Sequence, residues 1–225
     1  MIELEKKESI YFLTMDAGEN RWNTTFVREI AKALDTIEDD EGQGALITSS
    51  TDSKFFSNGL DLEWMQAPED HPDGGDREVF GEEFMYLMGR FITLPIPTVC
   101  ALNGHTFGAG FMFALSHDFR IMREDRGFIC ANEMQLGLPI PRPELALFKH
   151  KIPANAFFET VQLSKRWTGT DALKAGIVQE VSSFEELSEA ALRKAKELAP
   201  LANNRKNFGH QKEMLYGENA AINLA

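Results

Sequence analysis

The sequence has 225 residues, of which 43% are hydrophobic and 26% charged, as expected for one globular domain that buries a substantial core. Its formal net charge of −12 argues against nucleic acid or an anionic membrane surface as a partner, because both repel an acidic protein. No apolar run approaches the roughly 18 residues that a membrane-spanning helix needs. We also find no cluster of residues with the spacing of metal ligands.

Three features of the sequence favour a cytoplasmic protein. The first residues, MIELEKKESI, are too charged for a signal peptide, and the last four are not a peroxisomal address of the S-K-L type. The two cysteines, Cys100 and Cys130, lie in apolar runs, so we expect buried free thiols rather than a disulfide or a metal pair.

The first part of the chain alternates strand and helix patterns. Residues 9–15 are typical of a strand, and residues 45–48 are typical of a second, short and buried one. Between them, a cap at Asn23 or Thr24 and apolar residues near helical spacing predict a helix that ends at the acidic segment 38–42. Strand, helix and strand in this order predict a parallel crossover and an α/β fold.

The next segment contains a glycine turn, a loop and a helix. Asp61 follows the turn and is a candidate cap for a short helix, although spacing alone favours an ordinary loop. Residues 66–76 are acidic and rich in Pro and Gly, which predicts a surface loop. Residues 77–94 show the spacing of an amphipathic helix. Its Phe and Met side chains fit an acyl pocket, but core packing explains them as well.

The second half of the chain is predicted to be mainly helical. We expect a helix over 144–150, another over 153–167 and a short capped helix over 168–176 that runs into a strand. A long helix over 184–198 follows, and the residues after Pro200 are polar with a weak helical pattern.

Residues 99–141 hold the clearest chemical signals. A strand-like run from Val99 leads through Gly108-Ala109-Gly110 into an apolar run, which predicts unpaired backbone N–H groups at a helix N-terminus. Such groups stabilise a developing oxyanion. Glu133 lies further along in a largely uncharged stretch and is a candidate general base. From composition alone, however, a lone Glu is more often a solvated surface residue.

Five short motifs occur in order: FFSNGLDL at 55–62, PTVCALNGH at 97–105, Gly108-Ala109-Gly110, Asp118, and Thr168-Gly169 with Gly176-Ile177-Val178. Together they resemble the enoyl-CoA hydratase/isomerase (crotonase) superfamily, from about residue 8 to 199. The resemblance implies an α/β fold, a crotonase-like spiral of ββα units with a helical C-terminal region. Residues 1–199 would form the spiral core and 200–225 a short helical appendage. It also implies an acyl-CoA thioester substrate and a homotrimer or dimer of trimers.

The resemblance also implies which residues form the site. In the family, two backbone N–H groups hold the thioester oxygen, and the matching positions here are Leu60 and Ala109. Ala109 stands where many relatives have Gly, but a backbone donor tolerates a methyl group where the dihedral angles permit it. The neighbouring positions are expected to bind substrate: Ser57, Asn58, Gly59, Gly108, Gly110 and Met112.

Met112 and Glu133 point to one branch of the family. Its hydratases resemble one another in carrying two glutamates, and Met112 occupies the first of these positions while Glu133 keeps the second. This pattern is similar to that of the Δ3,Δ2-enoyl-CoA isomerases of fatty-acid β-oxidation, in which one carboxylate can move a proton from C2 to C4 of a 3-enoyl thioester. No metal or separate cofactor is required, because coenzyme A is part of the substrate.

Two other functions stay open. One is another crotonase-type reaction, such as decarboxylation, thioester hydrolysis, or hydration assisted by Glu144; since Glu144 follows a Pro-rich turn, we do not expect it to reach the site. The other is a non-catalytic acyl-CoA-binding protein. Arg21, Lys54 and Arg90 are candidates for contacts with CoA phosphates, although exposed basic residues are usually only solvated. We expect structural roles for three further polar residues, His105, His117 and Asp118.

Overall fold

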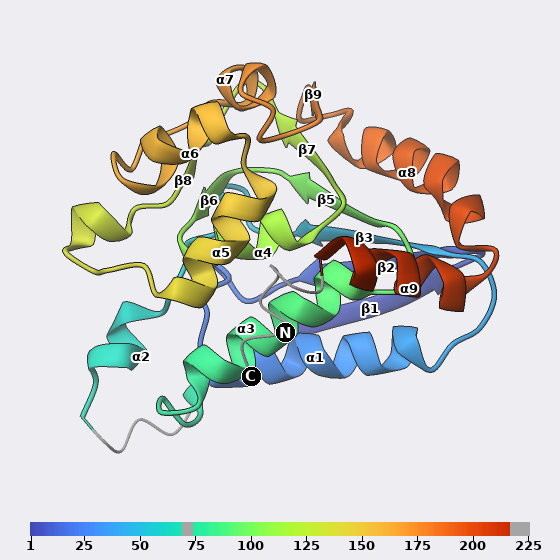
Figure 1. Ribbon diagram of the computed structural model, residues 1–225, viewed down its shortest axis with the longest axis horizontal. Coiled ribbons are helices and arrows are strands. Elements are labelled where there is room, and N and C mark those ends of the chain that lie inside the picture. Colours follow the sequence, from blue (N-terminus) through green and yellow to red (C-terminus); the bar gives the residue numbers. More distant parts are fainter. Residues whose placement is uncertain (69–73, 217–225) are drawn as a thin grey trace.

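In the part of the chain that the computed structural model describes, residues 1–68 and 74–216, six strands form a larger sheet in the order β1-β2-β3-β5-β7-β9 (Figure 1). These strands are β1 (Ile2–Lys7), β2 (Ile10–Met15), β3 (Ala45–Ser50), β5 (Thr98–Leu102), β7 (Phe119–Arg123) and β9 (Glu180–Ser182). β1 and β2 pair antiparallel, whereas every later pair of neighbours is parallel. The predicted parallel crossover is therefore confirmed.

The strands of a smaller sheet alternate along the chain with strands of the larger one. The smaller sheet contains β4 (Phe55–Ser57), β6 (His105–Phe107) and β8 (Ile129–Cys130), all parallel. The chain thus adds a strand to the larger sheet, then one to the smaller sheet, and then forms a helix before it starts the next turn. This is the expected spiral of ββα units.

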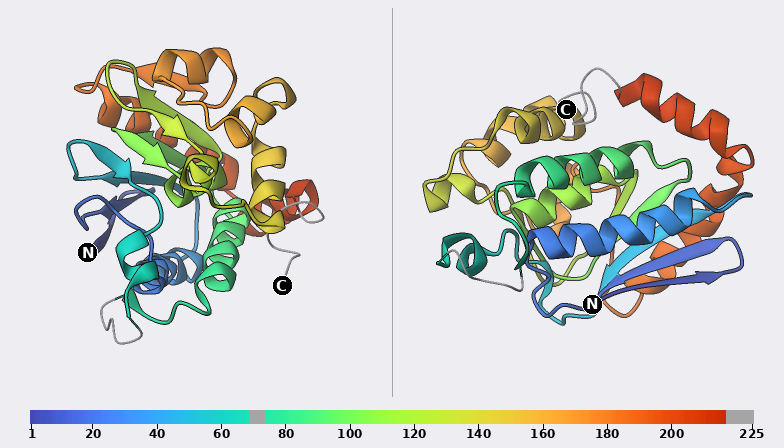
Figure 2. Two further views of the ribbon diagram at one scale, coloured as in Figure 1. Left: turned by 90° about the vertical axis from the view of Figure 1, so that its left-hand side faces the viewer. Right: turned by 90° about the horizontal axis from the view of Figure 1, so that it is seen from below.

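The larger sheet is covered on both faces. Neighbouring residues of a strand point to opposite faces, so Ile47 and Val99 pack with α8 (Leu187–Leu198), while Leu46 and Cys100 face the other helices. Those helices are α1 (Thr24–Glu38), α3 (Phe80–Thr93) and α4 (Ala109–Ser116). Figure 2 shows α1 and α3 side by side beneath the sheet. Burial of both faces explains why the central strands β3 and β5 are mostly apolar along their length.

Capping residues fix where the first helices begin. Asn23 caps α1, because its side chain accepts a hydrogen bond from the Phe26 N–H at 2.9 Å. Asp61 caps α2 (Leu62–Gln66) through the Trp64 N–H at 3.1 Å, which confirms the short helix after the glycine turn. The predicted helix over 77–94 is observed as α3.

Among the remaining helices, α6 (Ala154–Val161) differs most from its predicted range. They are α5 (Arg142–Lys151), α6, α7 (Gly169–Lys174), α9 (Arg205–Tyr216) and two 3₁₀ helices, η2 (Glu133–Leu136) and η3 (Ala199–Ala202). The prediction of a helix over 153–167 was wrong beyond Val161. There the backbone of Trp167 exchanges two hydrogen bonds of 2.9 Å with Ile129, and this pairing requires an extended chain.

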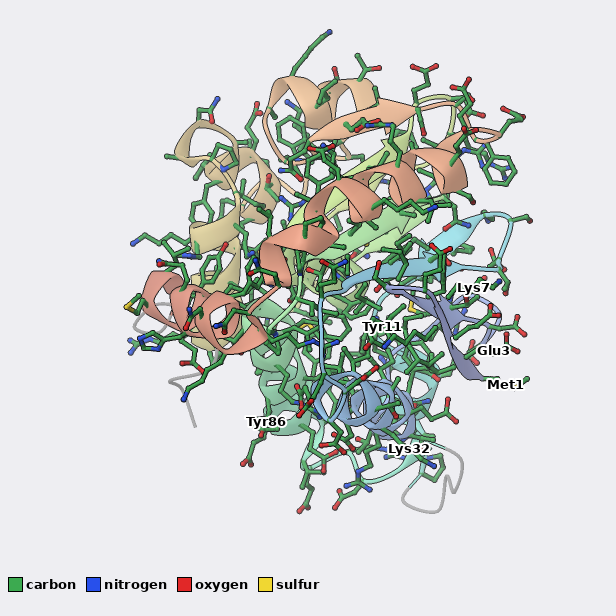
Figure 3. All side chains as sticks on the ribbon, turned by 90° about the vertical axis from the view of Figure 1, so that its right-hand side faces the viewer. Met1, Glu3, Lys7, Tyr11, Lys32 and Tyr86 are labelled. Atoms are coloured by element: carbon green, nitrogen blue, oxygen red, sulfur yellow. The ribbon has the colours of Figure 1, made fainter. Side chains whose placement is uncertain are left out.

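Strand β1 was not predicted from the sequence, in which only two of its six residues, Ile2 and Leu4, are apolar. It lies at the edge of the sheet, where Ile2 and Leu4 pack against the core while Glu3 and Lys7 face solvent (Figure 3). Charged side chains on an edge strand also discourage pairing with another chain.

Two predicted segments are only partly described. Residues 69–73 of the expected loop 66–76 and residues 217–225 of the C-terminal segment lie outside the described residues. Among the described residues, no helix combines the length and apolar character needed to cross a membrane.

Candidate active site

A cavity of about 520 Å³ lies between α2, α3, the start of α4 and the start of α5. Most of its wall is apolar: Leu60, Leu62, Met65, Phe80, Phe84, Met112, Leu136 and Leu138. Polar groups also reach it, from Arg21, Asn58, Glu63, Asn132, Glu133 and Glu144. An apolar cavity with a few polar groups fits an acyl chain with a reactive polar end.

Two glycines bring separate chain segments together in the cavity wall. Gly59 has φ of +83°, and a Cβ there would lie 2.8 Å from the carbonyl oxygen of Phe107. A Cβ on Gly108, whose φ is +49°, would come within 4.0 Å of the Gly59 Cα. Glycine adopts the backbone angles of both positions without strain, and at Gly59 it also avoids the clash with Phe107. As a result, the next residues, Leu60 and Ala109, lie in the same wall.

The backbone N–H groups of Leu60 and Ala109 are free to bind a ligand. The Trp22 N–H donates to the carbonyl oxygen of Gly59, and the Asp61 N–H donates to the carbonyl oxygen of Trp22. The N–H of Leu60 therefore takes no part in this pairing. Ala109 is the first residue of α4, where an N–H has no partner within the helix. Within the described residues, neither N–H donates to a protein acceptor. Both groups can therefore hold an oxygen that becomes negatively charged.

Glu133 lies directly over this wall. It is the first residue of η2, and its Oε1 would be 3.2 Å from a Cβ on Gly108. Its Oε2 is buried and has no hydrogen-bond partner among the described residues. Burial raises the pKa of the Glu133 carboxyl above its usual value. A half-buried carboxylate with an unpaired oxygen, in the same cavity wall as two free N–H groups, is suited to act as a base.

Contrary to the expectation from the sequence, Glu144 reaches the site. It stands in the first turn of α5 and lines the same cavity as Glu133. Burial, and then the negative charge of Glu133, raise the pKa of Glu144 to about 7. The sequence contains a signal for this position, because the apolar residues Leu147 and Phe148 lie three and four residues after Glu144 on the same helical face. Both are buried in the structure.

The residues expected to bind substrate fall into two groups. Asn58, Gly59, Gly108 and Met112 line the cavity, whereas Ser57 and Gly110 lie behind its wall. The Ser57 hydroxyl accepts hydrogen bonds from the Trp22 indole at 3.1 Å and the Gly59 N–H at 3.2 Å, and it donates to Asn20 O. A Cβ on Gly110 would lie 2.5 Å from Ser57 Oγ. Ser57 and Gly110 thus hold the wall in place.

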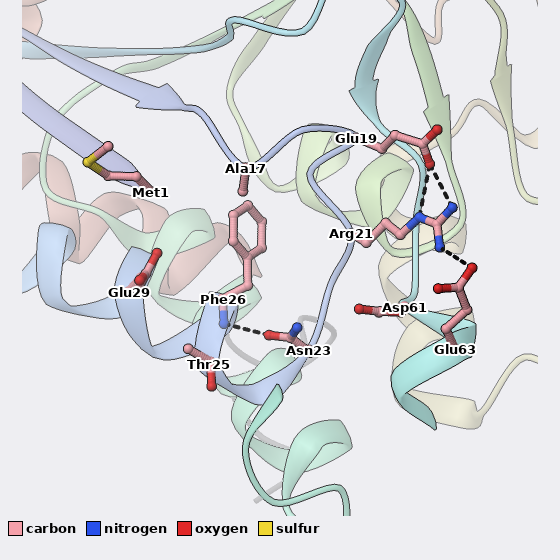
Figure 4. Close-up of a pocket in the computed structure, with 10 residues that line it drawn as sticks. All are labelled: Met1, Ala17, Glu19, Arg21, Asn23, Thr25, Phe26, Glu29, Asp61 and Glu63. Atoms are coloured by element: carbon pink, nitrogen blue, oxygen red, sulfur yellow. Dashed lines mark hydrogen bonds and ion pairs between the residues drawn. The ribbon is translucent and has the colours of Figure 1, made fainter. Parts of the chain in front are cut away.

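A second, more open groove of about 540 Å³ lies beside the cavity (Figure 4). Arg21 lines both and is held between two carboxylates, Glu19 at 2.9 Å and Glu63 at 3.3 Å. Glu29 and Asp61 add further acidic groups to the groove. An anionic ligand is therefore disfavoured there, and the cavity is the better candidate site.

The other candidates named from the sequence lie outside the cavity. Arg90 binds Asp35 and Glu38 of α1, and the ammonium of Lys54 lies 4.8 Å from the centre of the Phe55 ring. His105 packs among the rings of Phe55, Phe107 and Phe128, the closest at 5.1 Å. The described residues contain no group of three or more His, Cys, Asp or Glu side chains that could hold a metal ion.

Comparison with known proteins identifies the family. Residues 5–215 match the family model described as enoyl-CoA hydratase/isomerase. The chain belongs to the enoyl-CoA hydratase/isomerase family. A family member from Arabidopsis thaliana, enoyl-CoA delta isomerase 2, peroxisomal, is 32% identical over 227 residues, covering 99% of this chain and 95% of the relative. The resemblance inferred from the five motifs is thus confirmed.

Solved structures of the enoyl-CoA hydratase/isomerase family share the fold. The structure of a probable enoyl-CoA hydratase from Mycobacterium tuberculosis superposes with a TM-score of 0.87 at 26% identity, covering 99% of this chain and 92% of that one. The apo structure of an enoyl-CoA isomerase from the same organism gives a TM-score of 0.84 at 25% identity, with coverage of 98% and 92%. The predicted fold class, with two sheets and C-terminal helices, is confirmed.

Proposed function

We propose that this protein is a Δ3,Δ2-enoyl-CoA isomerase of fatty-acid β-oxidation, which converts 3-enoyl-CoA to trans-2-enoyl-CoA. The observation that carries the proposal is the position of Glu133, a half-buried residue with one unpaired, buried carboxylate oxygen, in the same cavity wall as the free N–H groups of Leu60 and Ala109. The similarity to an Arabidopsis enoyl-CoA delta isomerase supports the same reaction.

The arrangement supports a transfer of one proton between two carbons. A proton at C2 of a 3-enoyl thioester is acidic, and Glu133 removes it. The resulting dienolate places its negative charge mainly on the thioester oxygen, which the N–H groups of Leu60 and Ala109 stabilise. Losing one such donor in an enzyme costs about 3–4 kcal/mol of transition-state stabilisation, so two donors account for a large rate enhancement. Protonation at C4 completes the reaction.

Hydration is the second candidate, and Glu144 is the observation that favours it. Addition of water to a 2-enoyl thioester needs one group to activate water and another to handle the proton at C2. Met112 cannot serve as either group, because a thioether does not exchange protons at neutral pH. Glu144 is a second carboxyl group in the cavity. We therefore expect hydration to be detectable but slower than isomerisation.

A paired assay tests the proposal. Purified protein is given 3-hexenoyl-CoA, and formation of the conjugated thioester is followed; a second reaction follows hydration of 2-hexenoyl-CoA. We expect conjugation by the wild type and at least a 1,000-fold loss, on the order expected for removing a general base, in Glu133→Gln. The control is Glu124→Gln, an exposed glutamate that we expect to leave the rate unchanged. Rapid hydration without conjugation would contradict the proposal, and binding of CoA thioesters without either reaction would indicate a non-catalytic protein.

We also propose that the chain assembles as a homotrimer or a dimer of trimers. Large apolar side chains that a subunit interface would cover are exposed on three helices: Tyr86 on α3 (Figure 3), Phe158 on α6, and Met214 and Leu215 on α9. Sedimentation analysis checks the assembly, for which we expect a particle of three or six chain masses.

For its location we propose the cytoplasm, which the two free, buried thiols support. The name of the Arabidopsis relative specifies the peroxisome. Imaging of the tagged full-length chain distinguishes the two compartments, and a punctate pattern that coincides with a peroxisomal marker would contradict the cytoplasmic assignment.

A further inference from the structure

Glu144 is a carboxyl group whose presence in the cavity the single-base reaction does not explain. It lies one helical turn before Phe148, whose ring packs edge-on against Phe111 of α4 at 5.4 Å. The next residue of α4, Met112, lines the cavity, so the packing of α5 on α4 brings Glu144 into the wall of the same cavity as Met112. The cavity therefore contains a second carboxyl group, which comes from α5 and not from position 112 on α4.

The surroundings of Glu144 contain few other charges. The ionisable groups that line the same cavity are Arg21, Glu63 and Glu133, and Arg21 is already paired with Glu63. Helix α4 carries no ionisable residue, and on α6, which also packs against α5, Glu159 is paired with Lys165 at 2.7 Å. Arg142, at the start of α5, is exposed to solvent. Glu133 is therefore the charged group that dominates the environment of Glu144.

We propose that Glu144 is a second acid–base residue of this site, which delivers the proton to C4 of the substrate while Glu133 takes the proton from C2. This inference rests on the proposed isomerase function and assigns its two proton transfers to different residues. When two carboxyl groups share a site, they do not both ionise readily, so one holds a proton when the other is charged. Glu133 stands beside the two free N–H groups and acts as the base, which leaves Glu144 as the acid.

The proposed steps balance without any other reactant. The Glu133 carboxylate accepts the C2 proton, and the electrons of that C–H bond form the dienolate. The dienolate then takes the Glu144 proton at C4, and the double bond now lies between C2 and C3. Glu133 is left protonated and Glu144 ionised, and transfer of one proton from Glu133 to Glu144, directly or through solvent, restores the starting state.

Isotope transfer distinguishes two residues from one. In the wild type in D₂O, the C4 hydrogen comes from Glu144, which exchanges with solvent between turnovers, so we expect deuterium at C4 in nearly every molecule of 2-hexenoyl-CoA. In Glu144→Gln, Glu133 has to carry out both transfers. We expect the rate to fall about 10–100-fold, because Glu133 partly replaces the missing acid, and much of the C2 hydrogen to appear at C4.

The pH profile gives an independent readout. An acid with a pKa of about 7 loses its proton as the pH rises, so the wild-type rate should fall above about pH 7, and this alkaline decline should be absent in Glu144→Gln. Glu144→Asp should restore part of the rate and the solvent deuterium. The matched control is Glu189→Gln, an exposed glutamate in the first turn of α8, which should behave as the wild type.

The outcomes separate this inference from the proposed function. If the wild type isomerises, Glu133→Gln does not, and Glu144→Gln keeps the wild-type rate, isotope pattern and pH profile, the assignment of Glu144 is overturned while the isomerase proposal stands. If the wild type fails to isomerise 3-hexenoyl-CoA, both are overturned. Thermal unfolding is measured for every variant. If Glu144→Gln does not fold, the isotope pattern of Glu144→Asp is used instead. Extensive transfer of hydrogen from C2 to C4 in both the wild type and Glu144→Asp would exclude Glu144 as the second acid.

Discussion

The ammonium group of Lys212 on α9 donates to the Asp118 carboxylate at 2.6 Å, which ties the last described helix to the start of β7. Lys212 is only 5% exposed and also donates to the carbonyl oxygen of Ile96 at 3.1 Å. Asp118 accepts two more hydrogen bonds from Thr98, through its N–H and its hydroxyl. The ion pair therefore joins α9, β5 and β7, with the lysine buried and the aspartate partly exposed.

Replacing Lys212 by Met should loosen the contact of α9 with the rest of the molecule. Removing one partner of a buried pair leaves the other charge without compensation, which typically costs about 3–5 kcal/mol of unfolding free energy. Because Thr98 still donates to Asp118, we expect a value near the lower end. Urea unfolding measures the loss. Lys206→Met, an exposed lysine on the same helix, is the control, and equal stability of the two variants would contradict the role of the pair.

Two glycines with the same backbone angle allow a direct test of the cavity wall. Gly59 and Gly42 both have φ of +83°, but a Cβ on Gly42 would meet no atom within 4 Å, whereas on Gly59 it would lie 2.8 Å from Phe107 O. Gly42→Ala should therefore cost only about 1–2 kcal/mol, the strain of a positive φ. Gly59→Ala should cost a further 1–3 kcal/mol, roughly, from overpacking.

Gly59→Ala should also strongly reduce the catalytic activity. To accommodate the methyl group, the Gly59 segment has to move away from Phe107, and the Leu60 N–H moves with it. We expect conversion of 3-hexenoyl-CoA to fall at least 100-fold, on the order found when an oxyanion donor is lost, while Gly42→Ala keeps the wild-type rate. Activity in a well-folded Gly59→Ala protein would argue against Leu60 as an oxyanion donor.

Local signals in the sequence were enough to locate most of the fold and several residues that line the candidate site. The Asn23 and Asp61 caps, the apolar strands and the long amphipathic helices depend on neighbouring residues, and the structure confirms them. Glu133 and the glycine segments were found because they stand at characteristic positions in motifs.

Features that depend on contacts between distant residues were missed. The helix predicted over 153–167 ends early because Trp167 pairs with Ile129, a partner far away in the sequence. The distance of Glu144 from the site was likewise misjudged, since only the packing of Phe148 against Phe111 brings the first turn of α5 to the cavity. Such arrangements follow from tertiary packing, which a local pattern does not contain.

His117 should make the stability of the protein depend on pH. Its ring is fully buried between Phe113 O at 2.9 Å and Thr48 Oγ1 at 2.8 Å, and burial lowers its pKa to about 3. In the unfolded chain the ring takes up a proton below its usual pKa of about 6.5. The stabilisation from His117 is thus fully present above that pH and is lost as the pH falls towards the folded pKa. Glu144 acts in the opposite direction, because its raised pKa favours folding as the pH falls below about 7.

The difference between wild type and His117→Gln separates these two effects, because Glu144 is common to both proteins. At neutral pH we expect the variant to be less stable by about 1–3 kcal/mol, the range for buried polar groups that lose a partner. Between neutral pH and about pH 4.5 the wild type should lose about 2–3 kcal/mol of the His117 contribution, so the difference should shrink or change sign. Urea unfolding at several pH values measures it, with His210→Gln, an exposed histidine, as control. A difference that stays constant with pH would mean that His117 accepts its proton in the folded protein as readily as in the unfolded chain.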